Sequence, residues 1–409
     1  GTDPNNYIWY SGKLWRAVSI DPSDNSVKLV THWNISVIPY NASGNTAFEG
    51  SNMEAWLNDT SVDGFLGNLR DYENFIKTDS VWNATLTAAS TRKPESTTMV
   101  TDAVGLLNIY EYTMSYSGTT YSNGYLNNGL YWWSITPYSA SRVWSVRSNG
   151  DAYNNYNYPS DAYGVRPSIN LKSSVRIVDG DGTIDNPYRL NGDNDTNLSG
   201  TLLSSRYSGE YIRFGTGENN LYRIVSHENG TGTKITSAEP LKSGETFVTS
   251  AFDSNRNVNY SSSNTIGTFL NNDYLNTGNG YLTDEDIAMI EDATTWYLGT
   301  VGSGASYKLA KYTNTTDNIL TSSTTTAKVG LLRLGELMAG QFDSNTTYYW
   351  TITPYSAANV WRVYGNGNAY NNNPSNANGV RPSINLKSNV QIVNGDGTLN
   401  SPFEIQLVS

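Results

Sequence analysis

Residues 143–173 read VWSVRSNGDAYNNYNYPSDAYGVRPSINLKS, and residues 360–388 read VWRVYGNGNAYNNNPSNANGVRPSINLKS. The two passages agree almost letter for letter at their ends and differ in the middle. A second pair of motifs lies upstream of them at matching positions, YWWSITPYSAS at 131–141 and YYWTITPYSAA at 348–358. The repeat is much longer than the unit of a solenoid protein, so the sequence predicts a tandem duplication of a whole domain.

The duplication divides the chain into two domains, copy 1 at residues 1–192 and copy 2 at residues 206–409, joined by a linker at 193–205. The segment around the linker, NGDNDTNLSGTLLSS, is polar and contains glycine, which is typical of linkers between domains. A chain of 409 residues is also longer than one ordinary domain requires. Because the linker is polar, the two domains are expected to unfold independently.

The order of patterns within each copy predicts an α+β fold. Each copy begins with an alternating segment that is typical of strands, as in KLWRAV at 13–18. Two early helices are expected next, and a loop-rich antiparallel β half follows them. In copy 2 the helix that starts at Thr283 has Asp286 three residues further on, which is close to the pattern of a capping box.

Composition excludes several classes of function. The chain carries 26 Lys and Arg against 37 Asp and Glu, a net charge of -11, and an acidic chain is repelled by nucleic acid and by anionic membranes. Cysteine is absent, which excludes thiolate nucleophiles, cysteine-bound zinc and disulfides. No apolar run reaches the roughly 18 residues of a membrane-spanning helix, so neither nucleic-acid binding nor membrane insertion is expected.

The ordered motifs NYIWYSGKLWRAV, VGLL…EY, YWWSITP and GVRPSINLKSSVRIVDGDGT resemble a broad family of domains of unknown function on exported proteins of Gram-positive bacteria, often behind a pilin-type leader. The resemblance implies a C-type lectin-like fold for the later half of each domain, so that the chain would hold two tandem C-type lectin-like domains. It also implies an extracellular location, at the cell surface or on a pilus. An export or anchoring segment is expected to precede Gly1.

The strand at the start of the repeated passage indicates which of its sides is packed. Residues i and i+2 share a face of a strand. Trp144 and Val146 recur unchanged as Trp361 and Val363, whereas the residues on the other face are exchanged. A packed face resists substitution because a core is sensitive to each methylene group. The unchanged parts of the passage are therefore interpreted as scaffold, and the exchanged interior as a surface that displays side chains.

The displayed side chains are mostly Tyr, Asn, Ser, Asp and Arg, a mixture that combines rigid aromatic area with adaptable hydrogen bonding. A few Tyr and Arg residues dominate the binding energy of many interfaces. The predicted ligand-binding residues are therefore Arg147, Tyr153, Tyr156 and Tyr158 in copy 1, and Arg362, Tyr364, Tyr370 and Asn372 in copy 2. The alternative interpretation is that these loops are merely soluble turns.

The repeated GVRP motif places an arginine, Arg166 or Arg381, beside a turn in each copy. This arginine would either contact a ligand or tether loop carbonyls or a carboxylate in a partly buried frame, and the structural role is favoured. Glu111 and Glu336 occupy identical contexts in the two copies and are the candidates for that carboxylate.

No catalytic residue, cofactor or metal site is predicted. The two histidines, His32 and His227, do not occupy matching positions, and HExxH, GxSxG and phosphate-loop motifs are absent. Asp179, Asp181 and Asp185 surround a GDGT motif but fall short of an EF-hand calcium loop. A tight Asp-Gly turn is the favoured interpretation there, and calcium binding is the alternative.

These features predict a non-enzymatic adhesin or ligand-binding protein of the cell surface or of a pilus, with host or environmental glycans or proteins as its ligands. A structural subunit of a pilus or surface layer is the alternative, with other pilus subunits as partners. A glycan hydrolase is a more distant alternative, because it needs two facing carboxylates and no acidic pair recurs in both copies.

Overall fold

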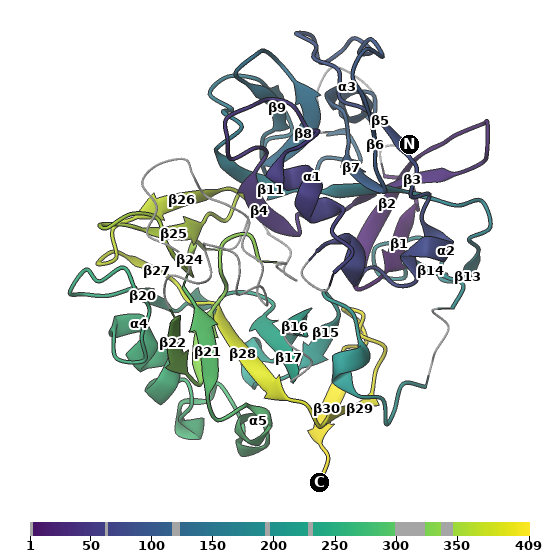
Figure 1. Cartoon of the computed structure of the whole chain (residues 1–409). Helices are drawn as coiled ribbons and strands as arrows, with labels where there is room; N and C mark the ends of the chain where they lie inside the picture. The colour runs from purple at the N-terminus through teal and green to yellow at the C-terminus, as the bar shows by residue number, and fades with distance from the viewer. Residues whose placement is uncertain are drawn as a thin grey trace.

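The two copies fold into similar sets of sheets in the computed structural model, with copy 1 in the upper part of Figure 1 and copy 2 in the lower part. The structure describes residues 3–61, 64–116, 123–192, 197–227, 232–298, 324–336 and 347–409.

Copy 1 is built on two larger sheets. The first has seven strands, in the spatial order β13 (Ile177–Asp179), β14 (Tyr188–Leu190), β1 (Tyr7–Tyr10), β2 (Lys13–Ile20), β3 (Val27–Thr31), β12 (Pro167–Leu171) and β7 (Val104–Leu106). The second has five, in the order β10 (Ala152–Tyr153), β9 (Val143–Val146), β8 (Trp132–Pro137), β11 (Ala162–Val165) and β4 (Ser36–Pro39). β1 pairs with β2 in an antiparallel manner and with β14 in a parallel manner.

Copy 2 repeats this plan with different edges. Its first sheet has the order β15 (Tyr211–Arg213), β16 (Leu221–Ser226), β17 (Gly232–Ser237), β28 (Pro382–Lys387) and β23 (Val329–Leu331). Its second has the order β20 (Thr249–Ala251), β27 (Ala377–Gly379), β24 (Tyr349–Pro354), β25 (Val360–Val363) and β26 (Ala369–Asn372). Ile212 of β15 forms a parallel bridge with Phe403, which matches the pairing of β1 with β14 in copy 1.

The remaining elements are two-stranded sheets and short helices. The paired strands are β5 (Val81–Asn83) with β6 (Met99–Thr101), β18 (Lys242–Ser243) with β19 (Thr246–Phe247), β21 (Thr294–Tyr297) with β22 (Thr324–Ala327), and β29 (Val390–Asn394) with β30 (Glu404–Leu407). The α-helices are α1 (Asn52–Leu57), α2 (Tyr72–Phe75), α3 (Ile109–Thr113), α4 (Thr265–Thr268) and α5 (Asp284–Met289). None of the helices in the described part of the chain has the length and apolar content needed to cross a bilayer.

The expected α+β class, with two early helices and a C-type lectin-like layout in each domain, is wrong. Among the described residues, strands in several separate sheets far outnumber helices, and each α-helix has only four to six residues. The predicted capping box at Thr283 and Asp286 is confirmed, but the helix it starts, α5, ends at Met289.

An asparagine in the helical region of each copy bonds to the strand of the VGLL motif. After α1, the side-chain nitrogen of Asn58 donates to the carbonyls of Glu54 and Val104. The side-chain oxygen of Asn58 accepts from the backbone N–H of Val104. Asn271 makes the same contacts to Val329 in copy 2. This side chain ties the helical region to the strand of the VGLL motif in both copies.

Each copy has a large apolar core of its own, but the two copies also share smaller clusters. One shared cluster joins Val37, Leu130 and Ala162 of copy 1 to copy 2 residues that include Leu334 and Val363. A second joins aromatic and aliphatic residues at β1 and β2 to Tyr211. Apolar contacts therefore connect the copies, which removes the basis for expecting them to unfold independently.

Polar contacts reinforce this junction. The ammonium group of Lys13 is buried and donates to the carbonyl of Ser208 at 2.8 Å, across the boundary between the copies. The backbone N–H of Tyr131 donates to the carbonyl of Asn366 at 2.8 Å. The junction thus combines a buried lysine with backbone hydrogen bonds that join the two copies.

The glycine of VGLL is required by close packing in both copies. A Cβ at Gly105 would lie 2.3 Å from Cδ2 of Trp82, and a Cβ at Gly330 would lie 2.5 Å from Cδ2 of Trp296. Both tryptophans are buried, so the repeated glycine and the repeated tryptophan form one packing unit.

We expect Gly105→Ala and Gly330→Ala each to lower the free energy of unfolding by about 1–3 kcal/mol, because the added methyl overpacks a buried indole. Denaturant titration would measure the loss. Gly278→Ala is the control, because the nearest atom to its Cβ would be a side-chain oxygen at 3.2 Å in an exposed turn. Losses at Gly105 and Gly330 no larger than the loss at Gly278 would contradict this packing argument.

Candidate ligand-binding surfaces

The arginines of the two GVRP motifs are buried frame residues. Arg166 is 1% exposed and donates from Nε to the carbonyl of Thr31 at 2.8 Å and from Nη1 to the carbonyl of Leu126 at 2.5 Å. Arg381 is 2% exposed and donates from Nε to the carbonyl of Ser237 at 2.8 Å. The prediction that these arginines tether backbone carbonyls is confirmed, and both are more deeply buried than expected.

The prediction that Glu111 and Glu336 are the partners of these arginines is wrong. Lys28 lies 2.7 Å from Glu111 in copy 1, and Lys234 lies 2.5 Å from Glu336 in copy 2. Both lysines lie on central strands, β3 and β17, which place them beside the carboxylates. Burial raises the pKa of Glu336, but the charges of Lys234 and Arg333 outweigh burial and hold its pKa below the ordinary value.

Neither histidine is placed for catalysis. His32 is buried, and its ring packs edge-on against Tyr7 and Trp33. Burial is the main cause that lowers its pKa well below the ordinary value. The ring of His227 is held by the hydroxyl of Thr233 and the carbonyl of Arg206. Both histidines therefore serve as packing or hydrogen-bonding residues.

In copy 1, the residues that differ between the repeats become exposed to solvent only after the end of β9. All four residues of β9 are buried, including Ser145 on the face that was interpreted as displayed. β9 lies inside its sheet between β10 and β8, so both of its edges are paired, and the burial of all four residues shows that both of its faces are covered. Arg147 follows the strand, and its guanidinium stacks on the ring of Tyr153 at 3.6 Å from the ring centre.

The tyrosine loop, which we define as residues 153–161, presents two aromatic rings to solvent. Tyr156 is 65% exposed and Tyr158 is 44% exposed. Between them, Asn157 is fully buried and donates to the hydroxyl of Ser145 at 2.8 Å and to the carbonyl of Tyr153 at 2.7 Å. The two tyrosines therefore point outward because the residue between them is anchored inward.

The backbone of the tyrosine loop has two further features, one uncommon dihedral angle and one hydrogen bond. Tyr156 has a φ of 58°, a left-handed conformation that is uncommon for an aromatic residue. Asp161 accepts a hydrogen bond from the backbone N–H of Tyr158 at 3.1 Å, and burial raises the pKa of this carboxyl to about 6. The loop is consequently held in one shape by its own side chains.

In copy 2 the corresponding residues form a cluster around Arg362. Its guanidinium donates to Asn378 at 2.7 Å and to the hydroxyl of Tyr364 at 3.2 Å. Tyr370 is 58% exposed at the edge of this cluster, and its ring lies 6.2 Å from that of Tyr364. Asn372 is the last residue of β26, and its side chain accepts hydrogen bonds from Asn373 and Asn376 in the turn that follows. The structure thus brings Arg362, Tyr364 and Tyr370 together and uses the side chain of Asn372 to hold that turn.

The two surfaces are not equivalent, because copy 2 uses part of its surface for contact with copy 1. The turn between β25 and β26 accepts the hydrogen bond from Tyr131, and its Gly367 lies beside Asn34 and Leu130. Tyr364, at the start of this turn, is the residue exchanged for Arg147 of copy 1. Some of the sequence difference between the repeats therefore accompanies packing between the copies rather than display.

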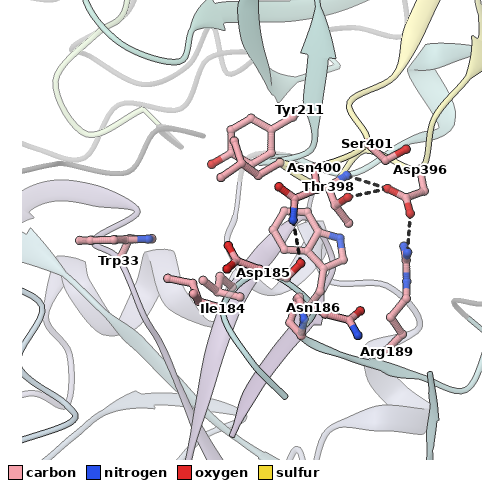
Figure 2. A pocket seen from close by; sticks show the side chains of 14 residues that line it. Trp33, Ile184, Asp185, Asn186, Arg189, Tyr211, Asp396, Thr398, Asn400 and Ser401 are labelled. Carbon is pink, nitrogen blue, oxygen red and sulfur yellow. Dashed lines mark hydrogen bonds and ion pairs between the residues drawn. The ribbon is translucent and has the colours of Figure 1, made fainter. Parts of the chain in front are cut away.

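A cavity between the copies was not predicted. It has a volume of about 340 Å³ and is lined by Trp9, Trp33, Tyr211 and two equivalent turns at 184–187 and 398–401 (Figure 2). Ile184 and Leu399, which follow GDGT in the two copies, are 47% and 55% exposed. An apolar residue that recurs after a polar turn was the available signal, but the sequence does not reveal that the two turns meet.

The GDGT motifs are turns held by their own aspartates. Asp181 accepts hydrogen bonds from the backbone N–H and the hydroxyl of Thr183, and Asp396 accepts the same two from Thr398. These contacts confirm the predicted Asp-Gly turn. Within the described ranges, no three His, Cys, Asp or Glu side chains gather as ligands of a metal ion.

Comparison with known proteins gives one match. Residues 25–173 match the sequence profile of a domain of unknown function, DUF6273. This segment lies within copy 1 and contains the tyrosine loop. No curated protein and no solved structure shows a significant match to the chain.

Proposed function

We propose that the protein is a non-enzymatic ligand-binding protein of the bacterial cell surface or of a pilus, and that the tyrosine loop is its main contact surface. The observation that carries this proposal is the pair Tyr156 and Tyr158, which stand exposed on either side of a buried anchor, Asn157. Exposed tyrosines next to arginines are typical of residues that dominate binding energy.

The loop is organised before any ligand arrives. Asn157 and Asp161 fix the backbone on both sides of Tyr158, and the Arg147 side chain is already stacked on Tyr153. A surface that is ordered in advance loses less conformational entropy on binding, so more of the contact energy appears as affinity. The uncommon backbone at Tyr156 supports a role in binding, because such strain often persists at functional sites.

The chemistry of the loop suits a glycan or a protein ligand. Phenol rings stack on apolar faces, and the arginines Arg142 and Arg147 donate hydrogen bonds and pair with carboxylates. Arg142 lies near the ring of Tyr158, at 5.8 Å from its centre. The net charge of -11 disfavours large polyanions.

The alternative of a structural subunit has one observation in its favour. β13 forms an edge of the seven-stranded sheet, and its Ile177 and Val178 are 57% and 44% exposed. An exposed apolar edge strand is a surface on which another chain can add a strand. Isolation of the native protein as the repeating component of a filament would favour this alternative.

The hydrolase alternative gains no support from Asp102, an acid with a strongly raised pKa. Burial, together with a hydrogen bond to Glu54, raises the pKa of Asp102 to about 7. Two carboxyl groups in direct contact leave no space for a sugar between them, whereas glycosidases separate theirs by roughly 5–9.5 Å.

Binding of the purified protein to glycan and matrix-protein arrays tests the proposal. We expect a ligand to bind the wild type, and Tyr156→Ala and Tyr158→Ala each to cost about 1–2 kcal/mol of affinity or more, with the melting temperature unchanged. Ile20→Ala is the control, because its side chain in copy 1 is similarly exposed and lies outside the tyrosine loop. The absence of binding on all the arrays, or full binding by the Tyr156/Tyr158 double variant, would contradict the proposal.

A further inference from the structure

The cavity between the copies combines aromatic walls with polar groups. Trp9 and Tyr211, one from each copy, stack with their ring centres 6.3 Å apart and an angle of 23° between the rings. Figure 2 shows Trp33 on one side of the space, with Asp185 and Asn400 across from it. The volume of about 340 Å³ lies at the lower end of the range of small-molecule sites.

Most charges around the cavity are already paired. Asp396 is bound by Arg189 at 2.6 Å and by Thr398. Burial opposes ionisation of Asp396, but hydrogen bonds from Thr398 and Arg189 outweigh it and keep its pKa below the ordinary value. This ion pair bridges the copies and contributes no net charge to the cavity.

Two polar groups remain available to a ligand. Asn400 donates to the backbone carbonyl of Asp185 at 2.7 Å, so the main chain of Asp185 is held while its carboxylate is not. Neither the Asp185 carboxylate nor the Ser401 hydroxyl has a hydrogen-bond partner among the residues that the structure describes. The cavity therefore offers an acceptor and a hydroxyl next to indole and phenol rings.

We propose that this cavity binds a neutral saccharide of one or two rings. The C–H face of a sugar ring packs on indole and phenol surfaces, and its hydroxyls donate to the Asp185 carboxylate and exchange hydrogen bonds with Ser401. An anionic ligand would be repelled by Asp185, whose charge is not balanced within the cavity. The site goes beyond the tyrosine loop and does not depend on it, because none of its lining residues belongs to that loop.

A panel of neutral mono- and disaccharides tests the site: glucose, galactose, mannose, N-acetylglucosamine, lactose and cellobiose. Saturation-transfer NMR and isothermal titration calorimetry would be run at millimolar sugar on the wild type, with choline as a cationic probe. We expect at least one sugar to bind and choline not to bind. Binding by no sugar on this panel would overturn the proposal.

Substitutions at Asp185 distinguish binding of a neutral sugar from binding of a cation. We expect Asp185→Ala to weaken sugar binding about tenfold, and Asp185→Asn to retain most of it, because an amide oxygen still accepts from a hydroxyl. A cation would instead lose binding in both variants. Binding that is insensitive to Asp185→Ala, or choline binding that Asp185→Asn abolishes, would overturn the proposal.

Three controls keep the result interpretable. The Asp185 side chain is exposed and does not hold the turn, so the variants should keep the wild-type melting temperature. Ser401→Ala provides a second change in the same cavity and should also weaken binding. Tyr156→Ala should leave sugar binding in the cavity unchanged, which distinguishes failure of this site from failure of the tyrosine loop.

Discussion

Replacing Glu336 with glutamine should lower the free energy of unfolding by about 3–5 kcal/mol, because it removes the negative charge that faces Lys234 in a buried ion pair. The side chain of Glu336 is fully buried and that of Lys234 is 4% exposed. The amide of glutamine can still accept the hydrogen bond that Glu336 takes from the backbone of Arg333, so the variant removes mainly the charge.

The matched control lies in copy 1. Glu111 and Lys28 form the same pair at the same place in the fold, but their side chains are 19% and 21% exposed. Water screens that pair, so Glu111→Gln should cost no more than about 1 kcal/mol. Denaturant titration of both variants measures the difference. Equal losses in the two copies would contradict the view that burial decides the effect.

The same pair predicts how stability responds to acid. The pKa of Glu336 is held below its ordinary value in the folded protein, so the unfolded chain binds its proton more readily. The stability contributed by this group is therefore present above the ordinary pKa of a glutamate and is lost as the pH falls through the folded value. Glu336→Gln should flatten this part of the stability profile.

Truncating Leu130 in copy 1 should destabilise copy 2. Leu130 is fully buried in the cluster that it shares with Leu334 and Val363 of copy 2, and Leu→Ala changes at such sites cost about 2–5 kcal/mol. We expect the wild type to melt in one transition that Leu130→Ala shifts as a whole. Hydrogen exchange should also become faster in β25 of copy 2.

Leu126→Ala is the control for this effect. Leu126 is equally buried but lies in a cluster formed only by copy 1 residues. It should destabilise the protein by a similar amount without selectively exposing β25. Two separate melting transitions, with exchange in β25 unchanged by Leu130→Ala, would show that the shared cluster contributes little.

The sequence predicted correctly those features that depend on residues close together in the chain. Arg166 and Arg381 were assigned to the frame because GVRP recurs intact, and both prove buried against carbonyls. The start of α5 was predictable because a capping box involves only Thr283 and Asp286, three positions apart. Features of this kind depend on neighbouring residues in the chain, so they can be recognised from the sequence alone.

The missed features depend on contacts between distant residues. Asn58, which follows α1, bonds to Val104, which lies 46 positions away, and the sequence pattern did not reveal this contact. Lys28 was not matched to Glu111 because its position on β3 is clear only when the strands are aligned. The cavity needs Trp9 and Tyr211 from different copies, and no pattern within one repeat contains both.

The segments near the two ends of each copy also determine how it would respond to tension. β1 lies parallel to β14, and Ile212 lies parallel to Phe403 at the same place in copy 2. A pull on the two ends of a copy would slide these segments past each other along their length, so the hydrogen bonds between them would share the load and break together. An antiparallel hairpin there would instead open one bond at a time. In a chain without cysteine to form a covalent clamp, strand order supplies resistance to mechanical force.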